Sequence, residues 1–178
     1  MTTNSPIAAV PFNADSDRLD DDGAPMWTAK PPDHDVRLVW APSHNHRSSL
    51  AGVWWPRTRD AATELHALLP AVTDRVGGPV TRVSLNIGAW KGDQPRRLHV
   101  GETLVKLGWF NTMNPATLSV GRHGQDRLIV AVIPVDTDAS AAGELLHRLA
   151  TNAWPDNVEV ALEALQPGNR AEQPTWGK

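Results

Sequence analysis

One short segment carries the residues best suited to chemistry, and it reads Gly52-Val53-Trp54-Trp55-Pro56-Arg57-Thr58-Arg59-Asp60. Two adjacent indoles lead into a predicted helix start that holds two guanidinium groups. Because a helix N-terminus beside arginine suits phosphate or carboxylate, the segment is a candidate anion site. The competing interpretation, which we favour, is that both indoles pack inside and that Arg57 or Arg59 pairs with Asp60 or a neighbouring acid.

The two indoles cannot share one environment if the segment is a strand. Adjacent strand residues point to opposite sides of a sheet. We therefore expect Trp54 and Trp55 to separate, one into the core and one onto the second side. There it would be covered by a loop or left open to a protein partner.

A second candidate surface is the polar side of a predicted strand. It carries Arg82, Ser84 and Asn86, and the cations Arg96, Arg97 and Lys106 are expected nearby together with Trp90 and Trp109. Arginine beside exposed tryptophan can stack bases or hold an anionic ligand. The alternative, which we favour, is a solvated or helix-covered sheet face whose charges are offset by Asp93 and Glu102.

The sequence shows no recognisable metal or catalytic motif. His44-Asn45-His46 falls in a predicted loop with no third ligand at a known spacing, so we predict no metal site. Cysteine is absent, no serine lies in a nucleophile-elbow pattern, and neither phosphate-binding glycine motif occurs. His66, His99 and His147 are expected to be solvated. We therefore predict no catalytic residue and no cofactor, and we lean against an enzyme.

Composition limits the compartment and the partners. The chain has 178 residues, of which 40% are apolar and 21% charged, and its net charge is −3. This charge gives no general attraction to nucleic acid or anionic lipid, so binding to either needs a local patch. The absence of cysteine favours a reducing cytoplasm. The longest apolar run, 128–134, is too short to cross a membrane, and residues 1–10 lack a leader pattern.

The chain divides into three parts by composition. Residues 1–35 combine Thr, Asn, Ser and Pro with an acidic cluster, Asp15, Asp17, Asp20, Asp21 and Asp22. Too few large apolar groups are present there to offset the entropy of ordering, so we predict a disordered acidic tail. Residues 36–165 are predicted to form a single domain, and 166–178 a second disordered tail.

Period-two alternation and turn residues predict seven strands in the central part. A glycine-first pair, Gly101-Glu102, favours a type II′ hairpin between two of them. The run from Leu128 to Ile133 is apolar on both sides, which is typical of a strand near the sheet centre. The predicted strands are 36–40, 50–55, 80–87, 97–100, 103–109, 117–120 and 127–133.

Apolar residues at helical spacing predict two helices. The first is expected to be capped by Thr58 and to end at Gly77, with a kink or a break into two short helices at Pro70. The second follows a cap at Asp136, Thr137 or Asp138 and ends before Pro155. A short third helix is predicted at 158–165. Together these elements indicate an α+β fold, a mainly antiparallel sheet of about five to seven strands covered on one face by two helices.

Several of these segments together resemble one family. They are 52–60, Glu64-Leu65, Leu69-Pro70, 80–83, Trp90, 95–98, Leu107-Gly108 and 128–134. The chain is similar there to an uncharacterised actinobacterial family, domain of unknown function five-nine-nine-four, and WWPR-x-RD is the most specific part. Thr58 stands where serine is expected, a change that preserves a helix cap. The resemblance implies an actinobacterial source and brings no activity, ligand or catalytic residue.

The resulting functional hypothesis is a non-enzymatic cytoplasmic binding or regulatory module. An alternative is nucleic-acid or phosphate-ligand binding through arginines 57, 59, 82, 96 and 97, with affinity that falls steeply with salt. A further alternative is an enzyme whose site converges from His, Asp or Arg in a cleft that the sequence does not reveal.

Overall fold

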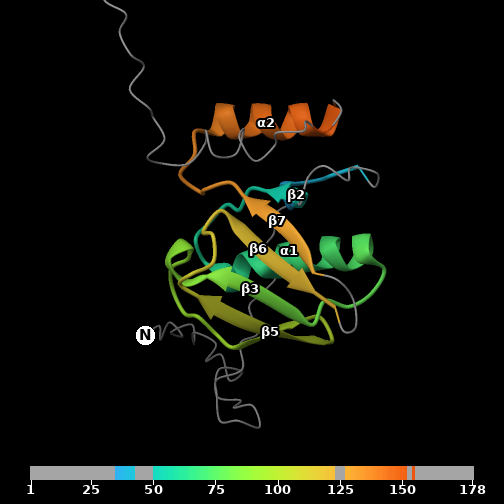
Figure 1. Cartoon of the computed structure of the whole chain (residues 1–178), viewed down its shortest axis with the longest axis vertical. Coiled ribbons are helices and arrows are strands. Elements are labelled where there is room, and N and C mark those ends of the chain that lie inside the picture. The colour runs from blue at the N-terminus through green and yellow to red at the C-terminus, as the bar shows by residue number, and fades with distance from the viewer. Residues whose placement is uncertain (1–34, 43–49, 123–126, 152–153, 155–178) are drawn as a thin grey trace, which may run out of the picture.

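The computed structural model describes residues 35–42, 50–122, 127–151 and 154 (Figure 1). The predicted helix at 158–165 and the tails lie outside these residues. The strands are β1 (Leu38–Trp40), β2 (Leu50–Trp54), β3 (Arg82–Asn86), β4 (Arg97–Val100), β5 (Thr103–Phe110), β6 (Thr117–Gly121) and β7 (Leu128–Val132). The helices are α1 (Ala61–Val76) and α2 (Ala139–Thr151), with a 3-10 turn at Ile87–Ala89.

The strands form one seven-stranded sheet in the order β1-β2-β7-β6-β3-β5-β4. Four neighbouring pairs are antiparallel, whereas β2 with β7 and β3 with β5 are parallel. Strand β6 is antiparallel to both β7 and β3, so β2, β7, β3 and β5 all run in one direction. The predicted α+β class with a mainly antiparallel sheet and two helices is confirmed.

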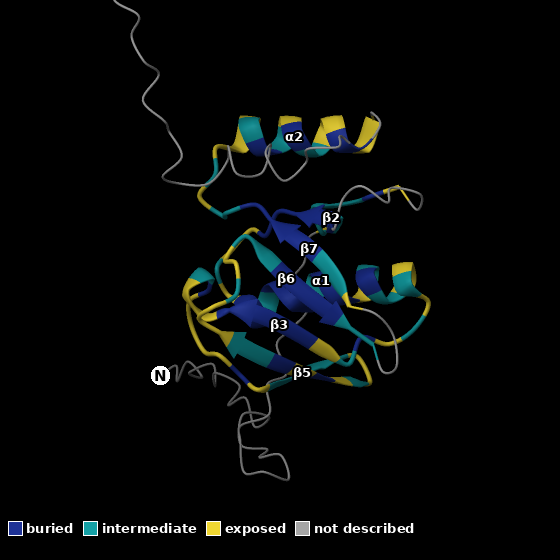
Figure 2. Cartoon of the chain, viewed as in Figure 1, coloured by how far each residue is buried: buried dark blue, intermediate teal, exposed yellow. Residues whose placement is uncertain are grey.

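The two helices cover opposite faces of the sheet, so the prediction that both lie on one face was wrong (Figure 1). Helix α1 packs on the face that carries Trp54, Val83 and Leu118, and α2 packs on the face that carries Val53 and Ala131. The reason is that β2 and β7 are apolar on both sides, which requires cover on both. Figure 2 shows most of β7 in the colour of buried residues.

The predicted strand positions are largely confirmed. Gly101 has a φ of 59° at the turn between β4 and β5, where Val100 lies opposite Thr103, so the predicted hairpin is present. Strand β3 is shorter than the predicted strand 80–87: it ends at Asn86, and Ile87 is 41% exposed in the 3-10 turn.

Helix α1 begins two residues later than predicted. Asp60 is its N-cap and accepts a hydrogen bond from the backbone N–H of Thr63, so the predicted Thr58 cap was wrong. The helix runs without a break through Pro70 and ends, as predicted, at Gly77 with a left-handed φ of 66°. For α2, the predicted cap is confirmed at Asp138, whose side chain accepts from the N–H of Ala141.

Gly52 allows β1 and β2 to approach closely. A Cβ atom there would lie 2.9 Å from the Val39 carbonyl oxygen and 2.9 Å from a ring carbon of Trp40. No larger residue fits without moving the backbone of β1. The close approach of β1 and β2 therefore explains why residue 52, two positions before the WWPR sequence, is glycine.

His66 lies on the buried side of α1, contrary to the prediction that it is solvated. It is 9% exposed, and its Nε2 is buried with no hydrogen-bond partner in the described part of the chain. Burial lowers its pKa from the ordinary 6.5, because the charged imidazolium loses hydration. His147 is exposed as predicted, whereas His99 is only partly exposed.

The lowered pKa of His66 predicts that stability depends on pH. In the unfolded chain His66 binds a proton near pH 6.5, whereas in the folded chain it does so only at lower pH. The stability that neutral His66 contributes is therefore fully present above pH 6.5 and is lost as the pH falls through the pKa of the folded state. The loss can reach about 1.4 kcal/mol for each pH unit in that window. Urea unfolding from pH 8 to 5 should show a weaker acid loss for His66→Leu than for the wild type. The exposed control His147→Gln should behave like the wild type, and an equal effect of both substitutions would contradict the assignment.

Candidate functional site

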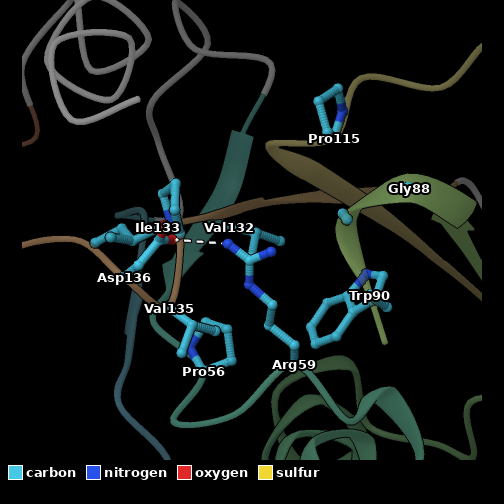
Figure 3. A pocket seen from close by; sticks show the side chains of 11 residues that line it. Pro56, Arg59, Gly88, Trp90, Pro115, Val132, Ile133, Val135 and Asp136 are labelled. Atoms are coloured by element: carbon cyan, nitrogen blue, oxygen red, sulfur yellow. Dashed lines mark hydrogen bonds and ion pairs between the residues drawn. The ribbon is translucent and has the colours of Figure 1, made fainter. Parts of the chain in front are cut away.

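A pocket of about 280 Å³ lies where the parallel strands end (Figure 3). The carboxyl ends of β2, β3 and β7 all point to this edge of the sheet. Such edges are common ligand sites in sheets with parallel strands, because the loops that follow the strands surround a hollow. The lining residues are Pro56, Arg59, Gly88, Ala89, Trp90, Pro115, Val132, Ile133, Pro134, Val135 and Asp136.

Trp54 supports the wall of the pocket from behind. It is 1% exposed on the α1 side, and its ring stacks on Trp90 with centroids 5.6 Å apart and an interplanar angle of 24°. Trp90 in turn lines the pocket (Figure 3). The adjacent Trp55 belongs to the core under α2, so the predicted separation of the two indoles is confirmed, with a helix as the cover of the second one.

Glu64 holds the loop that presents Arg59. Its carboxylate is 2% exposed and accepts hydrogen bonds from both the backbone N–H (2.8 Å) and the hydroxyl (2.9 Å) of Thr58. The backbone N–H of Lys91 donates to the carbonyl of Arg59 at 2.8 Å, which ties this loop to the residue after Trp90. Arg59 and Trp90 are thus positioned by one hydrogen-bonded unit.

Arg59 and Asp136 form an ion pair within the pocket lining (Figure 3). Nη2 of Arg59 donates to Oδ1 of Asp136 at 3.1 Å, and the two side chains are 38% and 55% exposed. The pKa of Asp136 is lowered, first by a hydrogen bond from its own backbone N–H and then by Arg59. Because both side chains are exposed to solvent, the ion pair contributes little to stability, and the guanidinium of Arg59 can exchange partners.

Asn86 shapes the opposite wall. Its side-chain carbonyl accepts from the N–H of Gly88 at 2.7 Å, and its amide donates to the carbonyl of Met113. This joins the turn after β3 to the loop between β5 and β6, which carries Pro115. The sequence indicated Asn86 only as a polar sheet residue, although an Asn followed by Ile-Gly is a turn signal.

Arg37 is a residue of this region that sequence reasoning missed. Its guanidinium lies 3.4 Å from the Trp55 ring centroid and donates to the carbonyls of Trp55 (3.0 Å) and Pro56 (2.7 Å). Its pKa is lowered, chiefly by burial and then by the positive charge of Arg57, with Glu64 opposing. Arg37 therefore fixes the strand end that leads into the pocket.

The remaining predicted site residues are dispersed. Arg57 and Arg96 are exposed and do not line the pocket, and Asp60 caps α1. Arg82 and Arg97 lie on the sheet face opposite α1, but Trp90 and Trp109 pack on the α1 side. The predicted surface of arginine beside tryptophan is therefore not formed around Arg82.

No metal site is found within the part of the chain that the structure describes. No group of three or more His, Asp or Glu side chains lies close enough there to hold an ion. His44 and His46 fall outside the described residues. Neither α1 nor α2 has the length and apolar character that a membrane crossing requires, a finding that covers only the described residues.

A protein-family model described as a family of unknown function, DUF5994, matches residues 37–149. The match covers most of the chain, including all the described strands, α1, and α2 except for its last two residues. The chain belongs to this family, as the resemblance at the WWPR segment indicated. No curated protein and no solved structure matches the chain.

Proposed function

We propose that this protein is a binding module whose pocket takes a small ligand with an apolar body and an acidic group. The observation that carries the proposal is an apolar hollow at the carboxyl ends of β2, β3 and β7 with the ion pair of Arg59 in its wall. Eight of its eleven lining residues are Pro, Val, Ile, Ala or Trp. Such a lining with a few polar groups is typical of small-molecule sites.

The size and the charges limit the ligand. A volume of about 280 Å³ lies near the lower end of ligand pockets, which span about 300–1,000 Å³, so a small molecule fits better than a polymer. Only one N–H of Arg59 is used by Asp136, which leaves donors for a carboxylate or phosphate. The indole of Trp90 supplies a flat apolar wall.

The same groups argue for binding without catalysis. The titratable side chains in the lining are Arg59 and Asp136. Arginine does not release its proton near neutral pH, and the lowered pKa of Asp136 makes its carboxylate a weak general base. A reaction would need a group that the pocket wall does not supply.

Amide and indole NMR shifts during titration with benzoate and with benzylamine test the site and its charge preference. We expect benzoate to shift the Trp90 indole N–H and the amides of Val132, Ile133, Val135 and Asp136 in a saturable way, because Arg59 favours an anion. Benzylamine should bind at least about tenfold more weakly, a difference of about 1.4 kcal/mol. Shifts spread over the surface, or equal affinity for both probes, would contradict the proposal.

A further inference from the structure

A row of basic side chains crosses the sheet face that α2 leaves uncovered. Arg82 on β3 lies opposite Lys106 on β5, and Lys106 lies opposite Arg97 on β4. On the other side of Arg82, a Cβ atom at Gly121 would lie 3.9 Å from the Cβ of Arg82 and 4.0 Å from the Cγ of Arg127. We call Arg97, Lys106, Arg82 and Arg127 the basic row.

No described helix covers the basic row. The core beneath α2 draws on β1, β2 and β7 and contains no residue of β3, β4, β5 or β6. Figure 1 shows α2 on the β2 side of the sheet, away from β3 and β5. Arg82, Lys106 and Arg127 are exposed, and within the described residues none of these three forms an ion pair.

The placement of Arg82 directly opposite Lys106 is electrostatically unfavourable. Like charges placed directly opposite each other on neighbouring strands destabilise a sheet. Arg82, Lys106 and Arg97 are such neighbours in register. An anionic partner that lies along the basic row would replace this repulsion between cations with attraction. The row therefore favours binding of a segment that carries several negative charges.

The N-terminal part of the same chain carries the opposite charge and is a candidate for this partner. The described residues hold twelve Lys or Arg and nine Asp or Glu, a net charge of +3. Residues 1–34 hold six Asp against Arg18 and Lys30, a net charge of −4. Five of these aspartates fall within residues 15–22.

We propose that the acidic segment 15–22 binds the basic row of the same chain. Thirteen residue steps separate Asp22 from Asp35, which span up to about 40 Å when extended. Residue 35 precedes β1, and β3 lies four strands away in the sheet, about 19 Å. The segment therefore reaches the row.

Because the acidic segment belongs to the same chain, it should bind the basic row in preference to an external polyanion. A segment joined to its binding surface through a short stretch of the same chain has an effective concentration of about millimolar. Four cations give an external polyanion such as RNA only weak, salt-sensitive binding. The tethered acidic segment is therefore expected to occupy the row and to screen it from other polyanions.

A spin label in the acidic segment tests this proposal in the full chain. The sequence has no cysteine, so Ser16→Cys gives a single attachment point for a nitroxide. In about 20 mM salt we expect the label to broaden the amide signals of Arg82, Lys106 and Gly121 and to leave Arg148 on α2 sharp. In about 0.5 M salt, where the Debye length is only about 4 Å, the broadened signals should recover.

The control is the same labelled chain with the five aspartates at positions 15, 17, 20, 21 and 22 changed to Asn. We expect the broadening to disappear and added oligouridylate to shift the exposed amides of the row. Absence of broadening in the labelled wild-type sequence, or broadening that survives the Asp→Asn changes, would overturn the proposal. Oligouridylate binding to the row of the unaltered chain would assign this face to an external polyanion instead.

Discussion

Trp54→Ala is expected to lower the free energy of unfolding by about 3–5 kcal/mol, the cost of removing a large buried aromatic side chain. Trp54 is 1% exposed and packs in the core under α1, so neighbouring groups can fill only part of the space. Its stacking on Trp90, 5.6 Å between centroids, is lost as well. Urea unfolding followed by far-ultraviolet circular dichroism measures the change.

Trp109→Ala is the matched control for this prediction. Trp109 also lies on the α1 side, but it is only partly buried and donates its indole N–H to the carbonyl of Pro95. We expect Trp109→Ala to lower the free energy of unfolding by less and to leave the affinity for benzoate unchanged. The folded variant Trp54→Phe should bind benzoate more weakly, because Trp90 loses part of its support. Equal effects of the changes at positions 54 and 109 would show that Trp54 has no special role behind the pocket.

Glu64→Ala is expected to cost about 2–3 kcal/mol of stability, because it leaves two donors of Thr58 without their buried acceptor. The carboxylate is 2% exposed and receives both the N–H and the hydroxyl of Thr58. Glu64→Gln keeps an acceptor and should cost about 1 kcal/mol. The variants should also weaken benzoate binding, since this bond holds the loop that carries Arg59.

A double-mutant cycle with Thr58→Val separates the bond from other effects of the Glu64 change. We expect a coupling of about 1 kcal/mol between the two positions. Glu144→Ala, an exposed change on α2, should alter stability by no more than about 0.5 kcal/mol. Additive effects at positions 58 and 64 would mean that the hydrogen bond from the Thr58 hydroxyl to Glu64 does not stabilise the loop.

Much of the secondary structure could be predicted from local patterns. Alternation placed Val83 and Leu85 on one side of a strand, and Gly101 marked the hairpin, because both signals act over a few residues. The helix cap was misassigned because Thr58 and Asp60 can both cap. Glu64 decides between them by binding Thr58, which only the folded loop reveals.

The placement of each helix on a face of the sheet was harder to predict from the sequence. An apolar run such as 128–133 shows that both faces of a strand are buried, but it does not say which helix covers which face. Strand order decides this, and it depends on pairing between segments far apart in the chain. Both helices were therefore assigned to one face, whereas they cover opposite faces.

The candidate site was predicted only in part. Arg59 and Trp90 were both singled out, but on different surfaces, because Trp90 was expected beside Arg82. The strand ends at Asn86, and the turn that follows carries Trp90 to the α1 side against Trp54. Asp136 was read as a possible cap, and only the parallel pairing of β2 with β7 brings it to Arg59.

The dissociation constant of benzoate for the wild type, Arg59→Gln and Arg57→Gln tests the central claim most directly. Both arginines belong to the same loop and carry the same charge, but only Arg59 lines the pocket. We expect Arg59→Gln to weaken benzoate at least about tenfold and Arg57→Gln to leave the affinity within about twofold of the wild type. Equal loss in both variants, or no loss in Arg59→Gln, would contradict the assignment of the pocket as an anion-selective binding site.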